Sequence, residues 1–210
     1  MPRTVLKVVA MNCTLKNSED REKSSTEVLL TQLLEALKKE GVEGEMVRIA
    51  DFNVKPGVKS DEGKGDDWPS LRQRIVESDI LVIGSPIWLG QPSSVAKRIL
   101  ERMDAFFDEK DEHERTPAYS KVAFAVVVGN EDGAHHTATE IAGALMELGF
   151  TIPGGDSTYW VGAAMGSKEY KDFKTPPKAV AAWTKMLASN VTHLARLLKA
   201  SPYPGKSSKS

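Results

Sequence analysis

The sequence lacks most of the features that place a protein in a class at once. Its 210 residues include a single cysteine, Cys13, so no internal disulfide can form, and no Cys/His cluster for zinc is present. The longest apolar stretches, such as Val122–Val128, fall far short of the roughly 20 residues that span a bilayer. Strand-like residues begin by Thr4, which leaves no room for a secretory signal segment. We therefore expect a cytoplasmic protein that makes no membrane contact.

The sequence also lacks a strong excess of charge of either sign. Lys and Arg number 28 against 29 Asp and Glu, which gives a formal charge of −1. Nucleic-acid binders need clustered positive charge, and one-electron carriers dock through acidic surfaces, so this balance disfavours both. The glycine patterns GxGxxG and GxxxxGK[ST] are absent, which excludes the dinucleotide fingerprint and the P-loop. The pair His135-His136 does not predict a metal site, because adjacent helical residues point apart and no third ligand has suitable spacing.

The sequence does contain a repeated alternation between short apolar runs typical of strands and segments in which apolar residues have helical spacing. The predicted strands are Val5–Met11, Glu45–Ala50, Ile80–Gly84, Val122–Gly129 and Asp156–Val161. The predicted helices are Thr26–Glu40, Trp68–Ser78, Ser93–Phe107, His135–Leu148 and Pro177–Lys199. Strands apolar on both faces that alternate with helices indicate a doubly wound parallel sheet covered by helices on both faces. We expect one domain over residues 1–200 and a disordered tail over 201–210, which is rich in Pro, Gly, Ser and Lys.

Ligands of such sheets bind beyond the carboxyl ends of the strands, which selects three loops. The first, residues 11–26, carries hydroxyls and the cation Lys16, then opens a helix at Ser24-Ser25-Thr26. Backbone N–H groups and hydroxyls at a helix N-terminus favour a phosphate. The alternative is that Ser24–Thr26 only cap the helix.

The second and third loops differ in character. Ile87, Trp88 and Leu89 place large apolar side chains in the second loop, residues 84–93, which would suit a planar aromatic ligand. The alternative is packing beneath the loop or a subunit contact. The third loop, residues 129–136, has glycines that allow close backbone approach, and its Glu131 and Asp132 could serve only as helix N-terminal charges.

The residues of these loops resemble a known family. The segment SDILVIGSPIWLGQPSSVAKRILERMDAF, residues 78–106, is similar to a segment of the NADPH-dependent FMN reductases of the flavodoxin-like superfamily. GNEDGAH, residues 129–135, occupies the position of that family's third flavin loop. The resemblance covers roughly residues 4–165 and implies a five-stranded flavodoxin-like sheet in the order 2-1-3-4-5. There are two departures from the family pattern: Lys16 stands where arginine is usual, and about six extra residues, Asn17–Glu22, follow it.

The resemblance also implies which residues contact FMN. Thr14, Lys16, Ser25 and Thr26 would hold the phosphate. Pro86, Ile87, Trp88, Leu89 and Gly90 would line the isoalloxazine ring or the ribityl chain. Gly129, Asn130, Gly133 and Ala134 would approach the pyrimidine side.

The activity implied is transfer of a hydride from NADPH or NADH through bound FMN to a second acceptor, a free flavin, a quinone or a similar small molecule. No catalytic side chain is expected, because the cofactor carries the chemistry. The alternative is a flavodoxin-type electron carrier that does not oxidise NAD(P)H itself. Family members often complete the flavin site with a partner subunit, so a homodimer or homotetramer is expected. Cys13 is predicted to be a buried structural residue, and Trp160 to lie in the core or at a dimer contact.

Overall fold

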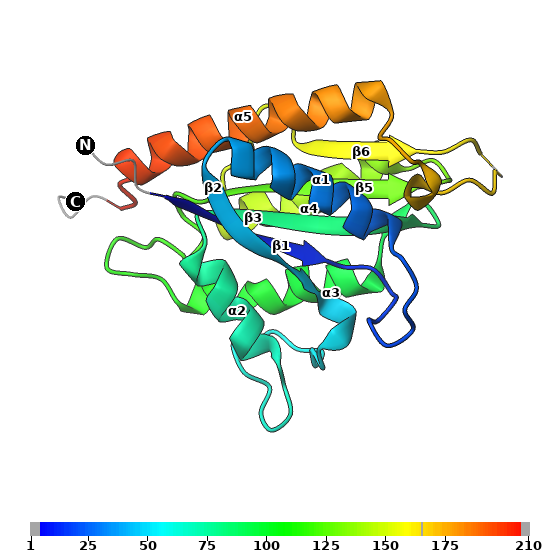
Figure 1. Ribbon diagram of the computed structural model, residues 1–210. Helices are drawn as coiled ribbons and strands as arrows, with labels where there is room; N and C mark the ends of the chain where they lie inside the picture. The colour runs from blue at the N-terminus through cyan, green and yellow to red at the C-terminus, as the bar shows by residue number, and fades with distance from the viewer. Residues whose placement is uncertain (1–4, 165, 207–210) are drawn as a thin grey trace.

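A twisted sheet forms the centre of the computed structural model, which describes residues 5–164 and 166–206 (Figure 1). Its parallel strands are β1 (Leu6–Asn12), β2 (Val42–Arg48), β3 (Ile80–Trp88), β5 (Val122–Gly129) and β6 (Ser157–Val161). They lie in the order β2-β1-β3-β5-β6, and the short β4 (Gln91–Pro92) pairs antiparallel with the end of β3. Leaving β4 aside, this arrangement confirms the predicted flavodoxin-like order.

Helices cover both faces of the sheet, as the apolar periods predicted. On one face lie α1 (Ser25–Lys39) and α5 (Lys178–Ala200), and on the other α2 (Trp68–Glu77), α3 (Ser94–Arg102) and α4 (Ala134–Leu148) (Figure 1). Each face has its own cluster of buried apolar side chains, and the strands contribute alternate residues to the two. None of these helices, within the described residues, is both long and apolar enough to cross a membrane.

Three differences from the sequence prediction change the nature of an element, beside shifts of one to three residues at other boundaries. The second strand ends at Arg48, and the residues Ile49–Asp51 form a 3₁₀ turn, η1. The third helix ends at Arg102 and continues as a 3₁₀ segment, η2 (Met103–Asp108). Both errors arise because a 3₁₀ segment this short shows no apolar period of its own. In the sequence, the apolar pattern of the preceding strand or helix therefore continues through it.

The third difference affects the site. The apolar loop predicted after Gly84 is a continuation of β3, which pairs with β5 as far as Pro86 and then turns back through β4. Beyond Gly84, β1 no longer pairs with β3. On that side β3 is therefore an edge strand, where a proline without an N–H is tolerated.

The C-terminal residues described by the structure are fixed to the body of the protein. The backbone N–H of Tyr203 donates to Ser120 Oγ at 2.8 Å, and its ring packs edge-on against Tyr119. The backbone N–H of Lys206 donates to the carbonyl of His113 at 2.8 Å. Residues 201–206, part of the tail for which the composition predicts disorder, thus contact the body of the protein through Tyr203 and Lys206. Residues 207–210 of that predicted tail lie outside the described residues.

Candidate functional site

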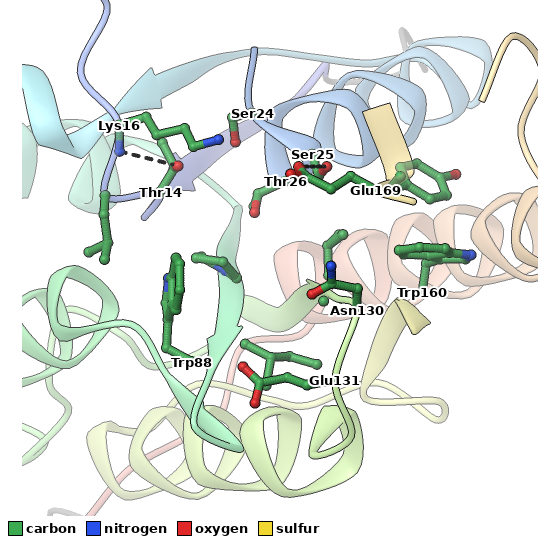
Figure 2. A pocket seen from close by; sticks show the side chains of 16 residues that line it. Thr14, Lys16, Ser24, Ser25, Thr26, Trp88, Asn130, Glu131, Trp160 and Glu169 are labelled. Atoms are coloured by element: carbon green, nitrogen blue, oxygen red, sulfur yellow. Dashed lines mark hydrogen bonds between the residues drawn. The ribbon is translucent and has the colours of Figure 1, made fainter. Parts of the chain in front are cut away.

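A cavity of about 150 Å³ opens where β1, β3 and β5 end (Figure 2). Its lining includes all four residues predicted in the first loop, three of the five in the second and two of the four in the third: Thr14, Lys16, Ser25, Thr26, Pro86, Ile87, Trp88, Gly129 and Asn130. The residues that the sequence prediction did not assign are Leu15, Ser24, Val128, Glu131, Trp160, Glu169 and Tyr170. The tertiary fold thus brings the three predicted loops to one place.

The N-terminus of α1 forms one wall of the cavity. Ser24 is the N-cap, and its hydroxyl accepts the N–H of Glu27 at 3.2 Å. Among the described residues, neither the Thr26 hydroxyl nor the backbone N–H groups of Ser25 and Thr26 have a hydrogen-bond partner. Ser24 alone therefore caps the helix. The backbone N–H groups of Ser25 and Thr26 and the Thr26 hydroxyl remain as donors for an anion.

A chain of alternating charges lies beside that helix end. The ammonium of Lys16 is paired with the carboxylate of Glu22, which lies 3.7 Å from the ammonium of Lys171. Lys171 in turn contacts the carboxylate of Glu169 at 3.1 Å, and Glu169 accepts a hydrogen bond from the Ser25 hydroxyl at 3.3 Å. The hydrogen bond from Lys16 lowers the pKa of Glu22. Partial burial disfavours the Lys171 ammonium, but its contacts with Glu169 outweigh this effect and raise the pKa of Lys171.

The extra residues 17–22 are folded against the end of β2. The hydroxyl and backbone N–H of Ser18 both donate to the Asp51 carboxylate, at 2.6 and 2.7 Å. The guanidinium of Arg48 donates to the carbonyls of Lys16 and Asn17. These contacts define the path of the insertion and place Glu22 next to Lys16.

The β3–β4 hairpin forms the opposite wall (Figure 2). Trp88 lines the cavity with about half of its surface exposed, whereas Leu89 at the tip is 91% exposed. The Leu89 N–H donates to the carboxylate of Glu131 at 3.0 Å, which ties the tip to the loop after β5. This contact gives Glu131 a role beyond that of a helix N-terminal charge.

Four of the predicted binding residues, Leu89, Gly90, Gly133 and Ala134, do not line the cavity. Gly133 has a φ of +105°, and a Cβ there would lie 2.7 Å from the Cα of Gly90. Ala134 is the first residue of α4 and is buried in the core. In this conformation Gly90, Gly133 and Ala134 position the hairpin and the start of α4, and Leu89 points into solvent.

The segment 166–175 supplies a third wall. Tyr170 is buried, donates its hydroxyl to Gln32 at 2.6 Å, and packs against Trp160 and Phe173. Trp160 therefore joins the packing of this segment and also lines the cavity. No motif marks Glu169 or Tyr170 in the sequence, because only the crossover from β6 to α5 brings them over α1.

Cys13 is fully buried next to the cavity. Burial raises the pKa of its thiol far above the usual range, which agrees with the predicted structural role. Its carbonyl accepts the hydroxyl of Ser93 at 2.7 Å, which joins the first loop to the start of α3. His135 contacts the hydroxyl of Tyr159 at 3.0 Å. Within the described residues, no group of three or more His, Cys, Asp or Glu side chains is placed to hold a metal ion.

A protein family and a related protein match most of this chain. A family model described as NADPH-dependent FMN reductase matches residues 6–164. The chain is 34% identical over 208 residues to the 8-demethyl-8-aminoriboflavin-5'-phosphate synthase of Streptomyces davaonensis, with 94% of this chain and 80% of that protein covered.

Solved structures agree with the family model. A crystal structure of RosB with the bound intermediate 8-demethyl-8-formylriboflavin-5'-phosphate gives a TM-score of 0.87 at 34% identity, covering 95% of this chain and 82% of the other. The apo form of an NADH:FMN oxidoreductase (EMOB), 17% identical, gives a TM-score of 0.65 over 92% of this chain and 89% of the other, and so shares the fold.

Proposed function

The chain belongs to the NADPH-dependent FMN reductase family, and on this premise we propose that it is an FMN-dependent oxidoreductase. When bound, FMN accepts a hydride from NADPH or NADH and passes electrons to a second acceptor, such as a free flavin or a quinone. The observation that carries the proposal is the contrast between the two main walls of the cavity. Unpaired donors at the start of α1 suit a phosphate, and the apolar hairpin opposite suits a planar ring.

The residues of this chain bind and orient the cofactor. Thr14 and Thr26 offer hydroxyls to the phosphate, Ser25 and Thr26 offer backbone N–H groups, and Lys16 offers an ammonium close by. Pro86, Ile87 and Trp88 flank the ring, and Gly129 and Asn130 lie at its polar edge. Asn130 is held by its hydrogen bond to the carbonyl of Gly166, 3.1 Å away. None of these residues has to act as an acid or a base.

The size of the cavity is informative about how much of FMN it encloses. At about 150 Å³ it is smaller than the roughly 300 Å³ or more of common ligand pockets. Part of the flavin would therefore lie outside it, where Trp88 and Leu15 are each about half exposed. One face of the ring would stay open to NAD(P)H and to the acceptor.

The same exposed surface supports a homodimer. Leu89, Trp88 and Leu15 project from the cavity mouth with 91%, 51% and 48% of their surfaces exposed. A cluster of large apolar side chains at a binding site is typical of a contact surface. We propose that a second copy of this chain covers it and completes the flavin site.

The test is an anaerobic titration of the FMN-reconstituted protein with NADPH and then NADH, followed by visible absorbance. Stoichiometric bleaching of the oxidised flavin band supports the proposal, and addition of free flavin or quinone should then restore the band. Bound FMN that neither nucleotide bleaches would instead indicate a flavodoxin-type carrier. Failure to bind FMN would refute the proposal.

A second candidate rests on the similarity to the Streptomyces davaonensis synthase over 94% of the chain. The name of that relative describes chemistry on a riboflavin phosphate itself, so this cavity could hold the flavin as substrate rather than as a resident cofactor. Mass spectrometry of the flavin after turnover separates the two. Unchanged FMN mass favours the oxidoreductase, and a modified ring favours the second candidate.

A further inference from the structure

We propose that Glu22 is a placeholder for the flavin phosphate, holding Lys16 and Lys171 together at the N-terminus of α1 until the phosphate replaces it. The proposal rests on the proposed function, because it assumes that a flavin occupies the cavity. It adds Lys171, from a segment outside the three expected loops, to the residues that select the phosphorylated ligand.

The first argument is the way in which one carboxylate joins two distant segments. Glu22 belongs to the insertion after Lys16, whereas Lys171 belongs to the segment between β6 and α5. Glu22 pairs with both ammonium groups. The backbone N–H of Lys171 also donates to the Ser25 hydroxyl at 3.2 Å, so this residue is fixed against the first turn of α1. Two cations are thus placed at the positive end of a helix.

The second argument is charge balance. Lys16 and Lys171 are neutralised by Glu22 and Glu169, so the four side chains carry no net charge. A phosphate dianion added to this group would face two carboxylates, which is unfavourable unless one of them leaves. Removing one carboxylate lets both ammonium groups turn to the phosphate, and charge-assisted hydrogen bonds of this kind are among the stronger ones in proteins.

The third argument identifies which carboxylate leaves. The Glu22 side chain is 53% exposed and lies on a surface loop, so it can return to water at little cost. Glu169 is less exposed and is held by the Ser25 hydroxyl as well as by Lys171. Its carboxylate also accepts the backbone N–H of Asp172, the last residue of the 3₁₀ turn Tyr170–Asp172. Glu22 is therefore the exchangeable group.

The test compares FMN with riboflavin, which lacks the phosphate, by quenching of flavin fluorescence. Lys171→Met should raise the Kd for FMN about tenfold, since a charged hydrogen bond is lost. Glu22→Gln should lower the Kd for FMN about twofold to fivefold, as expected for releasing an exposed ion pair. In both variants the Kd for riboflavin should stay unchanged.

Matched controls are available in the same two segments. Lys174→Met and Glu19→Gln remove exposed charges that form no ion pair within the described residues, and both should leave the two Kd values as they are. Equal shifts for FMN and riboflavin would show a merely structural role and overturn the proposal. An unchanged or higher Kd for FMN in Glu22→Gln would overturn it even if Lys171→Met did not fold. Wild-type protein that binds neither flavin would refute the proposed function instead.

Discussion

The two main walls of the cavity are built by different kinds of interaction. The hairpin wall is fixed through the backbone, by the β3–β5 and β3–β4 pairing and by the close contact between Gly133 and Gly90. The wall at α1 is fixed through side chains, by the charges of Lys16, Glu22, Lys171 and Glu169. Backbone pairing holds one geometry, whereas partly exposed ion pairs can exchange partners at low cost.

This difference indicates a division of labour. A rigid apolar wall suits the part of the ligand that must be oriented for electron transfer. An exchangeable polar wall suits the part that only anchors the ligand by charge. Changes in the hairpin should therefore affect all flavins alike, and changes at α1 should affect only the phosphorylated one.

The largest effect is expected at Gly133. Gly133→Ala places a Cβ 2.7 Å from the Cα of Gly90 at a φ of +105°, so both strain and a backbone clash oppose it. We expect the free energy of unfolding to fall by about 2–4 kcal/mol, measured by urea denaturation. Gly90→Ala is the matched control: its φ is +74°, but nothing lies within 4 Å, so only about 1–2 kcal/mol should be lost. Equal losses of unfolding free energy in the two variants would show that the contact between Gly133 and Gly90 does not contribute to stability.

The next effect concerns Trp88. Because this side chain lines the cavity with half of its surface exposed, Trp88→Ala should leave stability nearly unchanged. The Kd values for FMN and riboflavin should both rise about tenfold, since stacking on an aromatic ring contributes about 1–3 kcal/mol. Trp88→Phe should restore most of the affinity. A shift confined to FMN would contradict the assignment of Trp88 to the ring.

Thr26 tests the polar wall. Thr26→Val keeps the shape of this buried side chain but removes a hydroxyl that has no partner among the described residues. The Kd for FMN should rise about threefold to tenfold, the value of one hydrogen bond, with riboflavin binding unchanged. Ser24→Ala should instead cost about 1 kcal/mol of stability, because it removes the helix cap. If Thr26→Val weakened both flavins equally, the hydroxyl would not belong to the phosphate site.

The smallest effect on stability is expected at the tip of the hairpin. Leu89→Lys changes a side chain that is 91% exposed, so the free energy of unfolding should stay within about 0.5 kcal/mol of the wild type. If a second copy covers this surface, sedimentation velocity should show a dimer for the wild type and a monomer for the variant. A wild-type monomer at the same concentration would exclude the proposed dimer contact.

Much of the fold could be predicted because local signals were strong. Period-two and period-3.6 patterns located the parallel strands and the helices, and Ser24 marked the start of α1. The boundaries failed where signals were ambiguous. Pro86 reads as the end of a strand, yet it is tolerated because β1 has already ended beside it. Tyr203 lies in a segment whose composition is typical of disorder, yet its ring and backbone N–H contact Tyr119 and Ser120.

The site was predicted less completely, for a physical reason. Residues at the end of a strand or just beyond it inherit their position from the sheet, so the sequence could predict that Thr14, Trp88 and Asn130 lie at this cavity. Glu169 and Tyr170 follow no such rule, since their place over α1 depends on how the crossover from β6 packs.

The sequence by itself determined the order of strands and helices, and with it the edge of the sheet where a ligand would bind. Both follow from apolar periodicity and from chain connectivity, which are local properties. Only the tertiary structure decided that Glu22 stands between Lys16 and Lys171, and that Gly133 touches Gly90. Such contacts join residues far apart in the chain, and their geometry is set by the packing of whole elements rather than by any pattern within one.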